Sequence, residues 1–504
     1  MKNLVEIRRG MIRKRSSQSS QRGSEVDTSQ VRNPDIVNDN YLGLYSKGIT
    51  HDATTMVADE AKIKELQLAL ETGRQSDFDD IDKAGARKQA SPQACLSFEL
   101  SGGDPEGFTM DTAPALNSRQ AAAEMVEVYA KALLRDKAFK DYGDASQEVT
   151  DVIAALNAFG DDFLGPKDGG LVTAGTLFRG SSAGCLVGEY ISQLLMHPIG
   201  VGNFLYEPQG PTKTGVYGIS KANYVSIQNG NVPVSQTIDA TLKYMYNGRQ
   251  LGSTVHIDLV FQHFYEAAAI LLNAGVAVGS QIGVGPNEAN FIGGPVAVTT
   301  GIGEVARHAL RAAWVQKWRK QLRLRPEATA ARVVAELDGD LSVGTVHADL
   351  KNSSLVADVA AANLAAGGDN KAFLPLQYAE GSPTHPSYPA GHATIAGACA
   401  TLLKIWFTDG LWSSTGLSEL RGASDGLSTE SVTDSGITIH GEIDKAAHNI
   451  AIGRNFAGVH YRSDSELALG EKVAIQYYKD HKSLFNEAVS DVTFTGFDGT
   501  SITV

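Results

Sequence analysis

Cysteine and aromatic residues are scarce in this chain of 504 residues. Its three cysteines, Cys95, Cys185 and Cys399, are too few and too odd in number for a disulfide framework, and none lies near a second cysteine or a histidine at zinc-finger spacing. We expect all three to be small apolar core residues. Aromatic residues make up 7% of the chain and hydrophobic residues 42%. A chain of this length can bury a substantial core without disulfides or metal staples.

Long hydrophobic runs and an excess of positive charge are also absent. The sequence has no run of about 18 apolar residues, so we expect no membrane-spanning helix. The basic N-terminus, MKNLVEIRRGMIRKRSSQSSQRG, lacks the apolar stretch of a secretory signal, which makes the cytoplasm the default expectation. The net charge of −13, from 44 basic and 57 acidic residues, argues against a nucleic-acid-binding surface. An anion site in such a protein would need a local basic pocket.

The pattern of apolar residues predicts a mainly α fold with bundled helices. We expect residues 1–50 to form a partly extended N-terminal arm, 51–250 a helical region with coil and hairpins, and 251–504 a helical bundle, all within one compact unit. Helices are predicted at 55–75, 118–140, 145–159, 254–274, 303–324, 354–365, 393–407, 441–457 and 464–480. A Gly-rich start predicts one more apolar helix within 175–195, a hairpin is predicted at 214–236, and a terminal strand within 491–504.

The first segment that could carry chemistry is basic and runs from Trp314 through Lys317 to Arg325 and Pro326. Lys317 and Arg325 are eight positions apart, which is about 80° on a continuous helix. Pro326 disfavours helical geometry at Arg325, which could therefore turn toward a site at the helix end. The alternative is a solvated basic helix face.

The second segment, EGSPTHPSYPAGH (380–392), is a loop made rigid by three prolines. It leads into the helix predicted at 393–407, so Gly391 and His392 fall at a helix N-terminus. There, free backbone N–H groups and the helix dipole favour an anion. His392 could serve as an acid or base near neutral pH. The alternative is an ordinary helix start with a structural histidine.

The third segment runs from Gly453 to Glu466 and contains Arg454, His460 and Asp464. Arg454 offers a planar fork of donors suited to an oxyanion, and His460 offers a nitrogen ligand. Asp464, four residues later, could accept the other N–H of that histidine and fix its tautomer. A competing explanation is that Ser463-x-x-Glu466 forms a capping box, in which Asp464 favours the helix N-terminus by its charge. Both explanations can hold together.

Taken together, the three segments resemble the signature of the vanadium haloperoxidases and the related type 2 acid phosphatases. That signature has a Lys…Arg-Pro element, a Pro-Ser-Gly-His element and an Arg-x5-His-x3-Asp element. Residues 178–195, 255–272 and 373–393 are also similar to the algal and cyanobacterial bromoperoxidases. The resemblance covers the chain from about residue 170 onward. It implies a vanadium haloperoxidase-like fold with two helical bundles and minor β-hairpins, in which the 251–504 bundle carries a vanadate site.

Residue by residue, the resemblance implies a cage for vanadate. His460 matches the histidine that bonds vanadium, and Gly391 matches a backbone amide donor to the vanadate. His392 matches the acid–base histidine, and His385 matches the second active-site histidine of the algal bromoperoxidases. The cations that neutralise the vanadate oxygens are matched by Lys317, Arg325 and Arg454.

Two further positions fall near this cage in the family pattern. Ala390 stands where the family usually has a serine whose hydroxyl bonds a vanadate oxygen. We expect its absence to weaken cofactor binding or to retune the peroxo state, by about 1 kcal/mol if water replaces the hydroxyl. Trp314 matches a position near the halide pocket of related enzymes, and its alternative role is that of a core aromatic.

The resemblance implies an enzyme that oxidises bromide, and iodide more easily, with hydrogen peroxide and then halogenates a small organic acceptor. Lys317 would polarise the bound peroxide and His392 would help to deprotonate it. The implied assembly is a homodimer that builds a larger homo-oligomer, up to a dodecamer, with a structural divalent cation for which no ligands are assigned. Nucleic acid and membrane are not expected partners.

Two other functions stay open at this point. An acid phosphatase would use the same cage with His460 as the nucleophile. The Lys-x7-Arg spacing and His385 speak against it, since phosphatases usually have one residue fewer between the two cations. A non-enzymatic oxyanion-binding or shell-forming protein is the other alternative, and the presence of both His392 and His460 speaks against that one.

Overall fold

In the computed structural model, the described residues are 32–97, 103–278, 293–433, 435–483 and 488–504, with the backbone of 282–283 and isolated positions before residue 14. Most of the predicted N-terminal arm, 1–50, lies outside them. Helices dominate this described part, and every strand in it belongs to a two-stranded antiparallel sheet. The predicted fold class, mainly α with minor β-hairpins, is confirmed. The proposed division into an arm and two helical regions stays a prediction.

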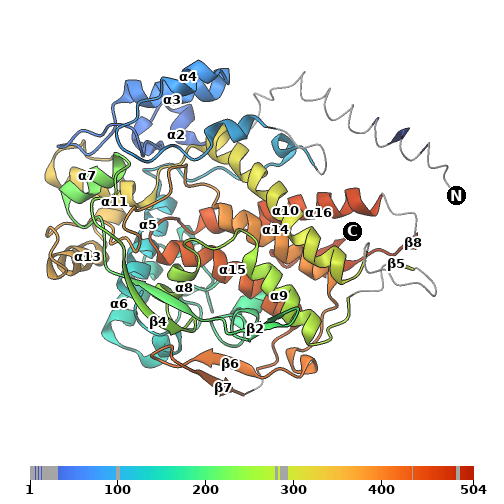
Figure 1. Cartoon of the computed structure of the whole chain (residues 1–504). Helices are drawn as coiled ribbons and strands as arrows, with labels where there is room; N and C mark the ends of the chain where they lie inside the picture. The colour runs from blue at the N-terminus through green and yellow to red at the C-terminus, as the bar shows by residue number, and fades with distance from the viewer. Residues whose placement is uncertain are drawn as a thin grey trace.

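Four helices form the centre of the molecule: α10 (Pro295–Val315), α14 (Gly391–Trp406), α15 (Ile439–Phe456) and α16 (Ala468–Lys482). Helix α14 packs against the other three, and Figure 1 shows all four in the middle of the view. Apolar on nearly every side, α14 has the pattern of a buried helix. Glycines allow α14 and α16 to approach closely, since a Cβ at Gly397 would lie 2.2 Å from the carbonyl oxygen of Leu467.

The remaining helices surround this centre. They are α2 (Pro34–Val37), α3 (Glu60–Thr72), α4 (Gln75–Asp79), α5 (Arg119–Leu133), α6 (Gln147–Asn157), α7 (Lys221–Gln228), α8 (Gly248–Thr254), α9 (Gln262–Asn273), α11 (Pro326–Asp338), α12 (Ala348–Lys351) and α13 (Ser354–Ala365). Each predicted helix outside 175–195 overlaps at least one of the observed helices, and α3 ends as predicted at Gly73, which has a left-handed φ of 66°. Helix α11 was not predicted.

The helix predicted within 175–195 is wrong. That stretch holds only short 3-10 turns at Ala183–Leu186 and Gln193–Leu195. Its glycines do not begin a helix. They allow this stretch to pack closely against α15. A Cβ at Gly184 would lie 2.4 Å from the Cα of Gly441, and a Cβ at Gly180 would lie 2.2 Å from the ring of His448.

In the described ranges, the short strands form two-stranded antiparallel pairs. The pairs are β1 (Ile199–Val201) with β2 (Phe204–Tyr206), β3 (Gly210–Thr214) with β4 (Thr237–Lys243), β5 (Ile282–Gly283) with β8 (Ala488–Val489), β6 (Glu419–Gly422) with β7 (Thr429–Val432), and β9 (Thr493–Thr495) with β10 (Ser501–Thr503). The terminal strand is confirmed as part of β9–β10. The hairpin predicted at 214–236 is wrong, because that stretch holds α7, capped by Ser220, and the paired strands β3 and β4 meet its two ends.

The predicted helix 303–324 is interrupted. Helix α10 ends at Val315 and continues as a single π-helical turn, Gln316–Gln321, which closes at Leu322 with a left-handed φ of 42°. Lys317 and Arg325 therefore do not share one helix, and the angle of about 80° between them does not apply. Arg325 is extended (φ −82°, ψ 154°) directly before Pro326, as the proline predicted.

The three cysteines are unpaired and buried, as expected from their number. No helix within the described ranges is both long and apolar enough to cross a membrane. The largest cluster of buried apolar side chains draws on residues from Met56 to Val504, and a smaller one joins the N-terminal segment and α3 to Trp318.

Candidate functional site

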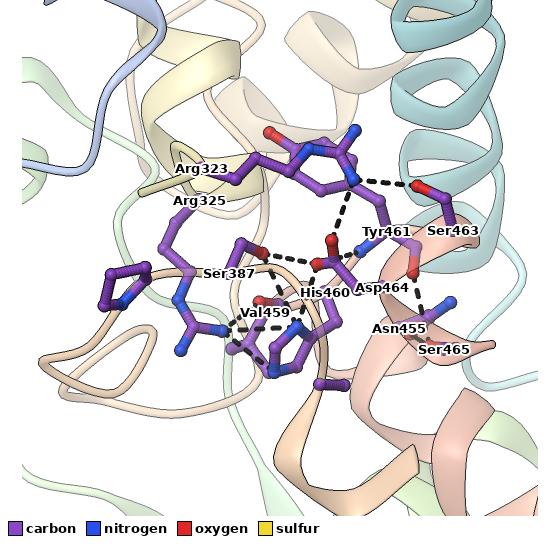
Figure 2. Close-up of polar contacts among 12 residues, drawn as sticks. Arg323, Arg325, Ser387, Asn455, Val459, His460, Tyr461, Ser463, Asp464 and Ser465 are labelled. Carbon is purple, nitrogen blue, oxygen red and sulfur yellow. Dashed lines mark hydrogen bonds and ion pairs between the residues drawn. The ribbon is translucent and has the colours of Figure 1, made fainter. Parts of the chain in front are cut away.

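His460 lies in the turn after α15 and is buried. Its Nδ1 is 2.9 Å from Oδ2 of Asp464, and that carboxylate also accepts bonds from the Ser387 hydroxyl and the backbone N–H of Tyr461 (Figure 2). An ionised carboxylate can only accept, so Nδ1 carries the hydrogen. Nε2 then presents a lone pair, which is what a metal ligand requires.

Asp464 is held in its ionised form. Burial alone would raise its pKa, but the charge of Arg323 and the hydrogen bonds from His460 and Ser387 outweigh burial and keep the pKa well below the usual range. The predicted capping box is wrong, because α16 begins only at Ala468. The hydroxyl of Ser463 accepts a bond from Arg323 instead (2.9 Å).

Arg325 faces the free nitrogen of His460. Its Nη1 lies 3.0 Å from Nε2 of that histidine and donates to the carbonyl of Val459 (2.7 Å), while Nη2 lies 3.0 Å from Nδ1 of His385. Burial lowers the pKa of Arg325 to about 10, and the charge of Asp464 opposes this shift. The Arg325 guanidinium therefore lies beside Nε2 of His460, where it could pair with a negatively charged ligand bound to that nitrogen.

Lys317 approaches the same region from the π-helical turn. Its Nζ donates to the carbonyls of Pro386 (2.8 Å) and Ser387 (2.9 Å), which lie in the proline-rich loop. Burial, together with the charges of Arg325 and Arg454, lowers the pKa of Lys317 well below its usual value. An anion placed between these cations would reverse that shift.

Arg454 lies in the last turn of α15. It donates to the carbonyl of Val255 (2.8 Å), and its guanidinium lies 5.3 Å from the ring centroid of Tyr378. Its Nε is buried and has no hydrogen-bond partner among the described residues. Because a buried donor left unpaired is costly, this nitrogen fits an oxyanion acceptor.

Helix α14 begins at the candidate site without a side-chain cap. Ala390 is the N-cap residue, fully buried, and its methyl group cannot accept a hydrogen bond from the first turn. Gly391 follows directly. A Cβ there would lie 3.5 Å from Leu310 and 3.6 Å from Trp314, so these two side chains lie directly beside this helix start. The positive end of the helix dipole adds to the three cations.

His392 contacts a carboxylate that the sequence analysis missed. Its Nε2 lies 2.9 Å from Oδ1 of Asp258, in the loop before α9, and 23% of the His392 side chain is exposed. Burial lowers the pKa of His392, although Asp258 opposes the shift. The neutral ring then carries its hydrogen on Nε2, toward Asp258. One sequence signal was an aspartate within the otherwise apolar run HIDLVF.

His385 and Trp314 lie side by side near the cage. Their ring centroids are 4.9 Å apart at an interplanar angle of 45°, and the Trp314 indole donates to the carbonyl of Ala90 (3.1 Å). Burial and the charges of Lys317 and Arg325 lower the pKa of His385 well below its usual range. The ring is therefore neutral, with Nδ1 facing Arg325.

The structure brings all the predicted site residues into one region, although their roles stay predictions. It also adds Ser387 and Arg323, which the sequence analysis missed. Arg323 joins Oδ1 of Asp464 (2.8 Å) to Glu124 of α5 (2.6 Å). No sequence pattern separates Arg323 from Arg319, which pairs with Glu106 elsewhere.

These side chains fit a tetrahedral oxyanion such as vanadate. Three buried cations converge, one of them has an unpaired donor, an uncapped helix start adds positive potential, and His460 presents a lone pair. Charge-assisted hydrogen bonds of this kind contribute roughly 1.5–3 kcal/mol each.

Comparison with known proteins supports this assignment. Residues 305–487 match the family described as the VCPO second helical-bundle domain. The chain is 31% identical over 468 residues to a vanadium-dependent bromoperoxidase of Ascophyllum nodosum, covering 88% of this chain and 83% of that protein. It is 29% identical over 554 residues to the vanadium-dependent bromoperoxidase of Corallina pilulifera, covering 94% and 92%.

The fold agrees with these similarities. A solved structure of a second vanadate-dependent bromoperoxidase from Ascophyllum nodosum superposes with a TM-score of 0.91 at 23% identity, covering 100% of this chain and 91% of that one. The predicted fold of the vanadium haloperoxidases is thereby confirmed, and the phosphatase alternative is not favoured. The chain belongs to the vanadium-dependent bromoperoxidases.

Proposed function

We propose that this chain oxidises bromide, and iodide more readily, with hydrogen peroxide, using vanadate bound at Nε2 of His460. The product, hypohalous acid, would halogenate a small organic acceptor. The observation that carries the proposal is the convergence of Lys317, Arg325 and Arg454 on the side of His460 that Asp464 leaves free. Lys317, Arg325, Arg454 and the backbone N–H of Gly391 would hold the vanadate oxygens.

Bound vanadate supplies a Lewis acid that activates hydrogen peroxide without changing its own oxidation state. The protein supplies proton transfer and charge stabilisation. His392 donates from Nε2 to Asp258, so its Nδ1 can accept a proton from the peroxide. Two of the three N–H groups of protonated Lys317 are bonded to carbonyls, so the third can stabilise negative charge on the reacting oxygens.

We place the halide beside Trp314 and His385. These two rings contact each other, and Trp314 also lies against the start of α14. Lys317 is 5.9 Å from the Trp314 ring centroid, so a halide beside these rings would lie close to a cation.

Bromination of monochlorodimedone tests the proposal. We expect peroxide-dependent bromination that requires added vanadate, and hydrolysis of phosphate esters at no more than a trace level. Hydrolysis of phosphate esters without any bromination would overturn it in favour of a phosphatase. Loss of both activities in the vanadate-loaded protein would favour a non-enzymatic oxyanion binder.

A pair of lysines gives the matched variants for this assay. Lys317→Met should lower kcat by about 100-fold or more, since it removes a charge that acts on the reacting oxygens. Lys320 lies on the same π-helical turn, but it pairs with Glu106 (3.4 Å), away from the cage. The Lys320→Met variant should therefore keep nearly all activity.

We further propose that the chain forms a homo-oligomer built from homodimers, with a dodecamer as the upper size. The solved Ascophyllum bromoperoxidase is described as homohexameric. The present chain exposes apolar side chains on the β1–β2 hairpin and the loop before α9: Phe204 (73%), Leu205 (73%), Ile257 (82%) and Leu259 (66%). Light scattering should give a multiple of 53.5 kDa, and Leu205→Asp should reduce that mass. A single-chain mass would contradict the proposal.

A structural divalent cation stays a prediction without ligands. Among the residues that the structure describes, no group of three or more His, Cys, Asp or Glu side chains is arranged to hold a metal ion.

A further inference from the structure

Four titratable side chains lie in a line that leads away from the candidate site. His392 Nε2 is 2.9 Å from Oδ1 of Asp258, and the other oxygen of that carboxylate, Oδ2, is 3.6 Å from Nε2 of His263. Nδ1 of His263 is in turn 3.3 Å from Oε2 of Glu266, one turn later on α9. Glu266 is fixed from outside, because its Oε1 accepts bonds from Gln262 (2.9 Å) and from Tyr206 on β2 (3.1 Å).

The inner members of this line are almost completely shielded from water. The exposed fractions of the Asp258, His263 and Glu266 side chains are 4%, 6% and 11%. Both ring nitrogens of His263 face a carboxylate, so the arrangement favours a ring with a hydrogen on each nitrogen. Burial alone would lower the pKa of His263, but Asp258 and Glu266 outweigh burial and raise the pKa to about 9.

We infer that His263 is a positioning residue for the acid–base histidine: as a buried cation between two carboxylates, it holds Asp258 toward His392 and offsets its negative charge. This inference rests on the proposed function, in which His392 accepts a proton from peroxide. His263 acts on His392 through its contact with Asp258 and through its charge.

The charge offset adds to burial, which is the largest cause that keeps His392 neutral. An unopposed carboxylate at 2.9 Å would favour the imidazolium form, which cannot accept a proton. The cation on the far oxygen of Asp258 reduces this pull. The other charge that acts on His392 is Arg454 of α15, which also favours the neutral ring. Together with burial, His263 and Arg454 therefore keep His392 ready to act as a base.

The fixed orientation is the second effect. Asp258 lies in the loop before α9, so the orientation of its carboxylate depends on the side chains around it. His263 attracts Oδ2 at ion-pair distance, 3.6 Å, which favours the orientation in which Oδ1 is directed at His392 and accepts the hydrogen from its Nε2.

Histidine NMR of the full-length protein without vanadate tests this inference independently of catalysis. In the wild type, we expect His263 to be doubly protonated at pH 7 and His392 to be neutral. His263→Gln should raise the pKa of His392 by roughly one unit, because it removes the positive charge that lies beside the far oxygen of Asp258. His263→Lys restores a cation and should bring the pKa of His392 back toward the wild-type value.

Two further variants separate charge from packing. Asp258→Asn should move the pKa of His392 downward, opposite to the effect of His263→Gln. His197→Gln, which removes another buried histidine, bonded to the carbonyl of Ser418 (2.9 Å), should leave the pKa of His392 unchanged. In the vanadate-loaded enzyme, the acid limb of the pH profile of kcat/KM for peroxide should shift with the NMR value of His392.

A neutral His263 at pH 7 in the wild type would overturn the inference, whether or not the variants fold. So would equal pKa values of His392 in the His263→Gln and His263→Lys proteins, since that result indicates a packing role alone. Absence of bromination in the wild type would overturn the proposed function but leave the NMR result for His263 and His392 standing.

Discussion

At the scale of single residues, Ala390 is the feature that sets this chain apart from the family signature. It is the N-cap of α14, and no side chain satisfies the first turn of that helix. Ala390→Ser would add both a helix cap and a hydroxyl beside the cage. We expect the Kd for vanadate to fall about fivefold, equivalent to about 1 kcal/mol, as measured by titration calorimetry. Ala390→Gly favours the N-cap conformation without a hydroxyl, so an equal gain in that variant would contradict a direct bond to vanadate.

Asp464 illustrates how one carboxylate organises several neighbours. It orients His460 and binds Ser387 and Arg323 at the same time. Asp464→Asn keeps the size and one acceptor but removes the charge that fixes the histidine tautomer. Changes to such an outer partner of a metal ligand typically cost 10–100-fold in affinity, so we expect a loss of about that size in vanadate binding. Unchanged affinity in a correctly folded variant would show that His460 needs no orienting charge.

At the scale of elements, the site depends on α5, a helix from the N-terminal half. Glu124 on α5 binds Arg323, which in turn holds Asp464, and Glu127 on the same helix binds Arg462. Glu124→Gln leaves a buried guanidinium with one charged partner fewer. We expect the free energy of unfolding to fall by roughly 3 kcal/mol in chemical denaturation.

The exposed pair Lys62–Glu65 on α3 provides the control for this measurement. Its two charged groups are 2.9 Å apart, but both side chains are about 40% exposed. Glu65→Gln should cost less than about 0.5 kcal/mol. Similar losses in the two variants would mean that the Arg323 link does not stabilise the fold.

The elements also show why part of the site could be predicted and part could not. The start of α14 was predictable because the loop before it contains three prolines, which do not continue a helix, and small apolar residues follow directly. The π-helical turn that positions Lys317 was not, since the apolar spacing of α10 continues through it without a break. Arg323 and Asp258 were missed because their roles come from Glu124 and His392, which are distant in sequence.

At the scale of the whole molecule, burial sets the charge of most histidines outside the line at α9. Burial and nearby positive charge lower the pKa of His448 to about 3 and that of His51 to about 4. A histidine with a lowered folded pKa contributes stability above its unfolded value of about 6.5 and loses it as the pH falls. His263 has the opposite sign, and its contribution is lost only as the pH rises through about 9.

Acid should therefore destabilise the cofactor-free protein before most of its carboxylates titrate. We expect Tm to fall between about pH 7 and pH 5, with each deeply buried neutral histidine contributing about 2 kcal/mol to the loss. Asp444 opposes this, because burial raises its pKa to about 6 and the folded state then takes up a proton before the unfolded state does. His448→Gln, whose ring lies 3.0 Å from Ser182 and outside the cage, should flatten the fall in Tm, whereas Asp444→Asn should steepen it. A Tm independent of pH over this range, or the same slope in both variants, would show that these buried groups do not govern the response of the molecule to acid.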